Sequence, residues 1–232
     1  MEMKFKQPLF LFGILLSTAL ACQALPTLTT EPLNEIVEPT AIPTEPPVKA
    51  SVLVEDSFDD PASGFLSLRD EEGITDYDQG GYRIKVDKPE WFFWVESGRT
   101  FTDVKIDVDA KKIGGPDNNE YGVICRYQDE NNFYFFTITS DGYYGVSKQL
   151  SDEISLIGMT ELKSSSAINQ VDGENHITVV CDGNKLQFSV NGTLLAELED
   201  DSFSSGDIGM IAASGDDPGT DILFDNLLVT SP

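Results

Sequence analysis

The stretch NHITVVCDGNKLQFSVNGTLLAEL, residues 175–198, reads as consecutive β-strands joined by tight turns. Apolar and polar residues alternate through it, and strands with one buried face show this period of two. Asp182-Gly183 and Asn191-Gly192 separate the alternating runs. Both dipeptides favour hairpin turns, which need positive φ angles. The stretch therefore predicts antiparallel strands that follow one another through hairpins.

The same pattern extends over most of the chain. Alternation recurs at 82–86 and 103–110, and further turn dipeptides stand at Gly80-Gly81 and Asp141-Gly142. No window of a dozen residues shows convincing helical spacing. Residues 51–232 are enough for one sizeable core. The sequence thus predicts a single all-β domain, a sandwich or a barrel, over 51–232.

The N-terminal residues 1–21 predict a signal peptide. Two lysines precede the uncharged apolar run LFLFGILLSTALA, which is too short to span a bilayer but suits a signal peptide. The run ends in TALAC, residues 18–22, which resembles the lipobox of bacterial lipoproteins. The resemblance implies that Cys22 is lipidated and anchors the chain in the cell envelope, facing outside the cytoplasm. The alternative is an ordinary secreted protein with an incidental cysteine.

Residues 22–50 predict an extended tether. Six prolines, five threonines and four glutamates lie in QALPTLTTEPLNEIVEPTAIPTEPPVKA. Proline favours extended backbone, and no period here could bury one face. The chain as a whole has a formal net charge of −25. Because such a surface repels polyanions, no nucleic-acid partner is expected.

Cys125 and Cys181 are the two remaining cysteines. In an oxidising compartment two thiols favour a disulfide. Strand alternation places both on the inward side of their strands, which predicts that they pair in the core. Two buried free thiols are the alternative.

Six segments together resemble the concanavalin A-like jelly rolls. In chain order they are GVICRY, NFYFFTI, DGYYGV, the stretch quoted above, GDIGMIA and ILFDNLLV. Laminin-G-like modules are similar, and the domain associated with 3-keto-disaccharide hydrolases is more similar still, through its VNG hairpin and closing F-x-N strand. The resemblance covers roughly 100–230 and implies a jelly-roll β-sandwich of two antiparallel sheets. Asn175 and His176 stand where that family has a tryptophan.

Residues for common hydrolytic chemistry are missing. The chain has one histidine, His176, and no G-x-S-x-G motif, which argues against a serine hydrolase and against zinc. Asp107 and Asp109 should stand about 6.6 Å apart on one strand face, near the spacing of inverting glycosidases. Lysines at 105 and 111 make an ordinary solvated face the better interpretation.

Strand alternation divides the aromatic-rich stretch NNFYFFTITSDGYYGV, residues 131–146, between two faces. Tyr134 and Phe136 share the phase of the core residues, whereas Phe135 and Tyr143 have the opposite phase. The stretch is therefore expected to supply both core residues and an outward aromatic surface.

The outward residues form the predicted ligand site. Arg126 is expected to face outward, because burying an unpaired guanidinium is costly, and Tyr127 is therefore expected to face inward. Flat rings can cover the C–H face of a sugar, and polar groups can bond its hydroxyls. The predicted ligand-binding residues are Trp94, Asp109, Arg126, Phe135, Tyr143 and Gln187. The alternative is that a loop covers this face and makes the rings a second small core.

A structural calcium ion is implied by the resemblance to jelly-roll glycosidases. Asp225 on the closing strand could supply one ligand, and Asp56 or Asp59 a second. The alternative is that these aspartates only organise turns. No other cofactor is expected.

Together these patterns favour a membrane-anchored, extracytoplasmic, monomeric glycan-binding module. Its partner is expected to be a polysaccharide or another glycan, and its membrane contact to be through the lipid alone. Two alternatives stay open, namely an enzyme acting on keto-sugars or related glycosides and a protein-adhesion module of the laminin-G type.

Overall fold

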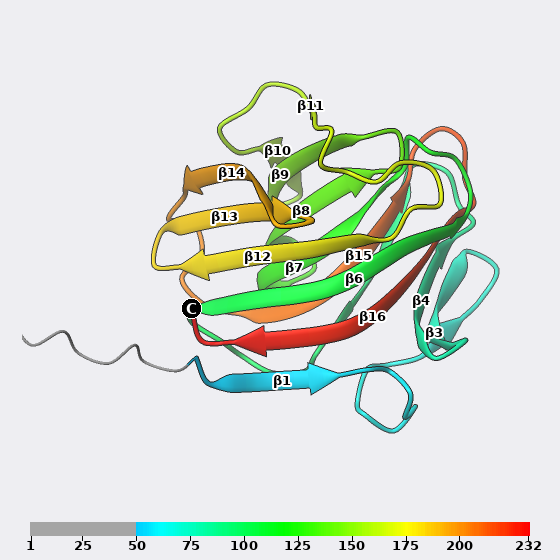
Figure 1. Cartoon of the computed structure of the whole chain (residues 1–232), viewed down its shortest axis with the longest axis horizontal. Coiled ribbons are helices and arrows are strands. Elements are labelled where there is room, and N and C mark those ends of the chain that lie inside the picture. The colour runs from blue at the N-terminus through cyan, green and yellow to red at the C-terminus, as the bar shows by residue number, and fades with distance from the viewer. Residues whose placement is uncertain (1–49) are drawn as a thin grey trace, which may run out of the picture. The chain divides into compact units, whose positions relative to one another are not determined.

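The computed structural model describes residues 50–232 (Figure 1). The predictions for the signal peptide, for Cys22 and for almost all of the tether lie outside the described residues. Within residues 50–232 every regular element is a β-strand, and no helix long and apolar enough to cross a membrane occurs there. The strands form two antiparallel sheets, as the all-β prediction requires.

Sheet A has nine strands in the order β14-β13-β12-β6-β16-β4-β3-β2, and β1 also pairs with β16. The stretch 175–198 forms β12, β13 and β14 as expected, joined by hairpins. The strands of sheet A are β1 (Val52–Asp56), β2 (Leu68–Arg69), β3 (Gly73–Asp78), β4 (Gly81–Val86), β6 (Val104–Gly114), β12 (Asn175–Asp182), β13 (Lys185–Val190), β14 (Thr193–Glu199) and β16 (Thr220–Thr230).

Sheet B has seven strands in the order β10-β9-β8-β7-β15-β5, and β11 also pairs with β9. The aromatic-rich stretch 131–146 forms β8 and the start of β9, at the middle of this sheet. The strands of sheet B are β5 (Trp91–Glu96), β7 (Glu120–Asp129), β8 (Asn132–Thr139), β9 (Tyr143–Leu150), β10 (Glu153–Leu156), β11 (Lys163–Ser164) and β15 (Asp207–Ser214).

The main core lies between the two sheets and follows the predicted alternation. Ile177 and Val179 of β12 are fully buried, as is Phe188 of β13. From sheet B, Tyr134 and Phe136 enter the same core, as predicted. Phe136 meets Phe188 edge to face, with ring centroids 5.7 Å apart, so aromatic rings from both sheets interlock at the centre.

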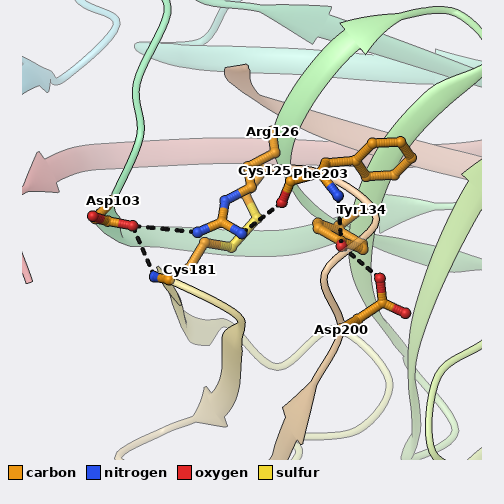
Figure 2. The surroundings of a disulfide bond; sticks show 8 residues. Asp103, Cys125, Arg126, Tyr134, Cys181, Asp200 and Phe203 are labelled. Atoms are coloured by element: carbon orange, nitrogen blue, oxygen red, sulfur yellow. Dashed lines mark hydrogen bonds and ion pairs between the residues drawn. A yellow bond between two sulfur atoms is a disulfide. The ribbon is translucent and has the colours of Figure 1, made fainter. Parts of the chain in front are cut away.

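A disulfide joins the two sheets. Cys125 on β7 bonds Cys181 on β12, and their Cα atoms are 6.9 Å apart (Figure 2). Both residues are fully buried. The predicted pairing is confirmed, and it adds a covalent link between layers that otherwise touch only through side chains.

A β-bulge at Arg126 reverses the alternation of β7. Arg126 has a left-handed backbone with φ of 55°, and β7 gains one residue against β15, because Ile124 pairs with Gly209 and Tyr127 with Asp207. One extra residue in a strand turns the side chains after it to the opposite face. Arg126 therefore points inward and is 1% exposed, while Tyr127 packs on the outer face. The predicted directions of Arg126 and Tyr127 are wrong.

Two of the three nitrogens of the buried guanidinium have acceptors, whereas Nε has no hydrogen-bond partner among the described residues. Arg126 Nη1 donates to the Phe203 carbonyl at 2.7 Å, and Nη2 donates to Asp103 Oδ1 at 3.3 Å (Figure 2). Asp103 Oδ1 also accepts from the Gly183 N–H at 2.8 Å. Arg126 thus ties two loops together beside the disulfide, and it is not available to a ligand on the outer face.

The hydroxyl of Tyr134 organises the segment after β14 (Figure 2). It donates to Asp200 Oδ1 at 2.6 Å and accepts from the Phe203 N–H at 3.1 Å. Burial alone would raise the pKa of Asp200, but hydrogen bonds, led by the one from Lys148, hold that pKa well below its usual range. Burial, and then the hydrogen bond to Asp200, raises the pKa of Tyr134 to about 12. The pair therefore stays as neutral phenol and carboxylate at neutral pH.

Candidate functional site

A second apolar cluster lies on the outer face of sheet B. Phe133 and Phe135 project outward from β8, where the alternation predicted an outward aromatic surface. Ile211 of β15 lies beside them and pairs with Trp94 of the edge strand β5. The Trp94 and Phe133 rings stack with centroids 6.1 Å apart. The cluster gives sheet B an apolar outer surface in addition to its core surface.

A groove of about 320 Å³, the central groove, lies over this cluster. Its floor comes from β7, β8, β9 and β15, and one wall comes from β10 and the segment after it. The residues that line it are Phe92, Glu120, Phe133, Phe135, Thr137, Ser147, Gln149, Ile154, Leu156, Leu162, Ile211 and Ala213.

The wall depends on a glycine in β9. A Cβ atom at Gly145 would lie 2.6 Å from Leu162 Cδ2 and 3.3 Å from Leu156 Cδ2. The absence of a side chain at 145 therefore lets both leucines lie against the sheet. Gly145 stands between Tyr143 and Ser147 on the same face, so the leucines separate Tyr143 from the central groove.

Polar groups interrupt the apolar floor at a few points. Thr137 Oγ1 donates to the Glu120 carboxylate. Ser147 and Gln149 lie further along β9 and are 5% and 8% exposed. Gln149 Nε2 donates to the Glu130 carbonyl at 3.0 Å, while its Oε1 is buried and has no hydrogen-bond partner among the described residues. A mostly apolar hollow with a few convergent polar groups is the usual form of a ligand site.

A second groove of about 520 Å³, the edge groove, lies at the β5 edge of sheet B. Phe92 and Gln149 line both grooves, so the two hollows are contiguous. At its rim, Lys88 Nζ lies 3.5 Å from the centre of the Trp91 ring and 2.8 Å from Glu72 Oε1. The residues that line the edge groove are Leu68, Glu72, Trp91, Phe92, Phe93, Trp94, Glu96, Glu130, Asn131 and Gln149.

Glu96 is the carboxylate of the edge groove with a shifted pKa. Burial, followed by the negative charge of Asp207, raises the pKa of Glu96 above its usual value. Removal from water disfavours the charged form of Glu96. A hydrogen-bond donor that reaches the carboxylate would therefore stabilise it.

Two of the four groove carboxylates, Glu96 and Glu120, lie far apart along sheet B. Glu96 aligns through Gly209 with Ile124, four residues along β7 from Glu120. At about 4.8 Å per strand and 3.3 Å per residue, the Cα atoms of Glu96 and Glu120 are about 16 Å apart. Glycoside hydrolases hold their two carboxyl groups about 5–9.5 Å apart. Glu96 and Glu120 could approach that spacing only if both side chains leaned towards each other along the sheet.

The predicted ligand residues do not come together in one site. Phe135 lines the central groove and Trp94 the edge groove. Tyr143 is on the same outer face and 43% exposed, but it lies beyond the Leu156–Leu162 wall. Arg126 is buried on the other side of sheet B, as described above.

Asp109 and Gln187 belong to sheet A, so their assignment to the same site as Phe135 is wrong. Gln187 of β13 donates to Glu197 Oε2 at 2.7 Å. Asp109 of β6 accepts from Asn226 at 3.0 Å and lies 2.7 Å from His176 Nδ1. Alternation predicts that a residue faces outward, but it does not tell which of two sheets carries it.

The sequence-based prediction of the ligand site omits several groove residues, although strand alternation places some of them on the outer face. Alternation with Trp94 places Phe92 and Glu96 on the same face of β5. Gln149 shares the outward phase of Tyr143. Leu162 lies outside any alternating run, so no pattern pointed to it.

The outer face of sheet A carries the Asp107–Asp109 pair as expected. Lys105 Nζ lies 2.7 Å from Asp107, and Thr178 Oγ1 donates to Asp107 at 2.7 Å. His176 bridges the pair, with Nδ1 2.7 Å from Asp109 and Nε2 3.4 Å from Asp107. These partners make the pair a bonded network in which Asp107 is 7% exposed, so the solvated face that the sequence predicted holds only for the partly exposed Asp109.

The calcium candidates do not come together. Asp56 accepts from the Phe58 N–H at 2.8 Å, and Asp59 accepts from the Ser57 hydroxyl at 3.0 Å. Asp225 accepts from the Asn226 N–H at 2.7 Å. Residues 50–232 contain no group of three or more His, Cys, Asp or Glu side chains that could hold a metal ion. A calcium ion therefore stays a prediction without geometric support from these aspartates.

Comparison with known proteins identifies solved structures that share this architecture. No family model and no curated protein matches the chain. Among solved structures, the carbohydrate-binding module CBM66 from Bacillus subtilis has a TM-score of 0.58 at 15% identity, covering 73% of this chain and 96% of that one. A Bacillus subtilis protein of unknown function with a galectin-like fold has a TM-score of 0.57 at 15% identity, covering 78% and 96%.

A third similar structure is an enzyme chain. The GH43 protein BlXynB from Bacillus licheniformis has a TM-score of 0.57 at 15% identity, and the match covers 81% of this chain and 41% of that one. Identities this low are evidence of shared fold alone. The described residues thus form a concanavalin A-like, galectin-like jelly-roll β-sandwich.

Proposed function

We propose that the domain binds a glycan in the contiguous central and edge grooves of sheet B. The observation that carries the proposal is the lining itself. Phe92 and Phe135 offer apolar ring surface, and Glu120 and Gln149 offer acceptors beside it. Sugars present an apolar C–H face and a hydroxyl rim, so they match such a surface.

The similar structures support this proposal without deciding it. One of them is a carbohydrate-binding module and another is a GH43 protein. A hydrolase is the weaker candidate, because the Cα atoms of Glu96 and Glu120 are about 16 Å apart and the Asp107–Asp109 pair is bonded to its neighbours. An adhesion module would need a broad, flat patch, whereas the apolar surface here lies in grooves.

Glycan binding is tested with a matched pair of aromatic variants. Phe135→Ala removes a groove ring, and we expect binding about fivefold weaker, because one ring contact contributes on the order of 1 kcal/mol. Tyr143→Ala removes a ring from the same face outside the groove and should leave affinity unchanged. Glycan-array screening followed by calorimetry measures both, with thermal melts to verify folding. Equal affinity of Phe135→Ala and the unmodified protein would contradict the proposal.

We also propose that the domain is held at the outer face of a membrane through a lipid on Cys22. The lipobox-like end of the apolar run supports this attachment. Mass spectrometry of protein extracted from membranes should find Cys22 as a diacylated N-terminal residue. Recovery of a soluble product that begins at another residue would exclude the anchor.

A further inference from the structure

The charged residues that line the two grooves are all acidic. They are Glu72, Glu96, Glu120 and Glu130, with no lysine or arginine among the lining residues. Only Glu72 has an ion-pair partner within residues 50–232, namely Lys88 at 2.8 Å. The other three carboxylates therefore leave a net negative charge in the grooves. At close range such a field attracts cations and repels anions.

Gln149 adds an independent sign that a donor belongs in the site. The Glu130 carbonyl can only accept a hydrogen bond, so the NH₂ group of Gln149 must be the end that faces it. Its Oε1 is then fixed on the other end, buried and unpartnered among the described residues. A buried acceptor left without a donor is costly. Gln149 lines both grooves, so the side chain that carries this acceptor lies where the grooves meet.

We propose that the grooves select a glycan with unacetylated amino groups, such as an oligosaccharide of glucosamine. This inference rests on the proposed glycan binding. An ammonium group brings both a positive charge and several N–H donors, and charge-assisted hydrogen bonds to carboxylates are stronger than those between neutral groups. Neutral sugars offer donors without the charge. Sugars with carboxylate or sulfate groups are disfavoured by Glu96, Glu120 and Glu130.

The two adjacent grooves together can hold more than one sugar unit. The central groove holds Glu120 and the edge groove holds Glu96 and Glu130, with Gln149 and Phe92 between them. A chain that spans both grooves can place ammonium groups near both sets of carboxylates. Affinity should therefore rise with chain length until both grooves are occupied.

A matched ligand series tests the charge preference. Titration calorimetry compares β-1,4-linked oligomers of equal length that differ only at C2, where they carry an ammonium, an acetamide or a hydroxyl group. We expect the ammonium series to bind about tenfold more tightly than the other two. The advantage should shrink between about 0.1 M and 1 M salt, as the screening length falls from about 10 Å to about 3 Å.

Charge variants separate the grooves from the overall acidity of the protein. Glu120→Gln and Glu96→Gln should each weaken the ammonium series several-fold and leave the hydroxyl series unchanged. Glu199→Gln makes the same charge change at an exposed position of β14 in sheet A and should leave every affinity unchanged. An equal loss in Glu199→Gln would show that net charge alone attracts the ligand and would overturn the selection.

The remaining outcomes are also decisive. If the hydroxyl series binds as tightly as the ammonium series and Glu120→Gln has no effect, the charge preference fails while glycan binding stands. If no oligosaccharide on a broad array binds, both the preference and the proposed function fail.

Discussion

Replacing both Cys125 and Cys181 with alanine is expected to lower the free energy of unfolding by about 4 kcal/mol, on the chain-entropy treatment of a closed loop. The two cysteines are 56 residues apart in sequence, so the bond removes much freedom from the unfolded chain. The loss of buried side-chain atoms adds to the destabilisation, because both cysteines are fully buried between the sheets. Equilibrium urea denaturation of the double variant and the unmodified protein measures the difference.

Reduction provides the control for this experiment. The unmodified protein is also denatured in the presence of a thiol reductant. Its free energy of unfolding should then equal that of the double variant, apart from the small effect of the two altered side chains. A difference below about 1 kcal/mol between the oxidised protein and the double variant would be far under the loop estimate. It would show that the bond contributes little to folding.

The second large effect is expected from Tyr134→Ala, at about 3–5 kcal/mol of destabilisation. Tyr134 is fully buried and meets Phe203 edge to face, with ring centroids 4.8 Å apart. Truncation leaves a cavity, and it also leaves the Phe203 N–H without the hydroxyl that accepts from it. Thermal and urea unfolding measure the loss.

Two further variants divide the effect of Tyr134 into its parts. Tyr134→Phe keeps the ring and removes only the hydrogen bonds, so it should cost about 1–3 kcal/mol. Tyr143→Ala, at the exposed tyrosine of β9, should stay within about 0.5 kcal/mol of the unmodified protein. If Tyr134→Ala and Tyr143→Ala cost the same, the assignment of these two rings to core and surface is wrong.

Alternation and turn chemistry were enough to predict the sandwich and its core. β12 and β13 each bury one phase of their residues, and the turns at Gly183 and at Asn191-Gly192 lie between paired strands. The disulfide followed from the same reasoning, because both cysteines have the core phase. These predictions succeed because they use only local periodicity, which the pleat of a strand imposes directly.

The bulge at Arg126 shows where local periodicity stops being informative. Nothing in GVICRY marks the extra residue, and the cause lies far along the chain at Gly206. A Cβ atom at Gly206 would lie 2.4 Å from the Arg126 carbonyl carbon and 2.5 Å from the Tyr127 oxygen, so only glycine allows these strands to approach there. The partner Asp103 lies 23 residues before Arg126 in the sequence. The site prediction failed for Arg126 because its neighbours are set by tertiary structure.

The pairing of β1 with the end of β16 has a consequence for how the domain can be combined with others. The Ser51 N–H donates to Ser231 Oγ at 2.9 Å, and the Ser231 N–H donates to the Ser51 carbonyl at 2.9 Å. A host polypeptide could therefore enter and leave this sandwich with its two loop ends a hydrogen bond apart, which is the geometry that domain insertion requires. Both ends belong to sheet A, whereas the grooves open on the outer face of sheet B. An inserted copy would thus present its grooves away from the sheet that joins it to the host.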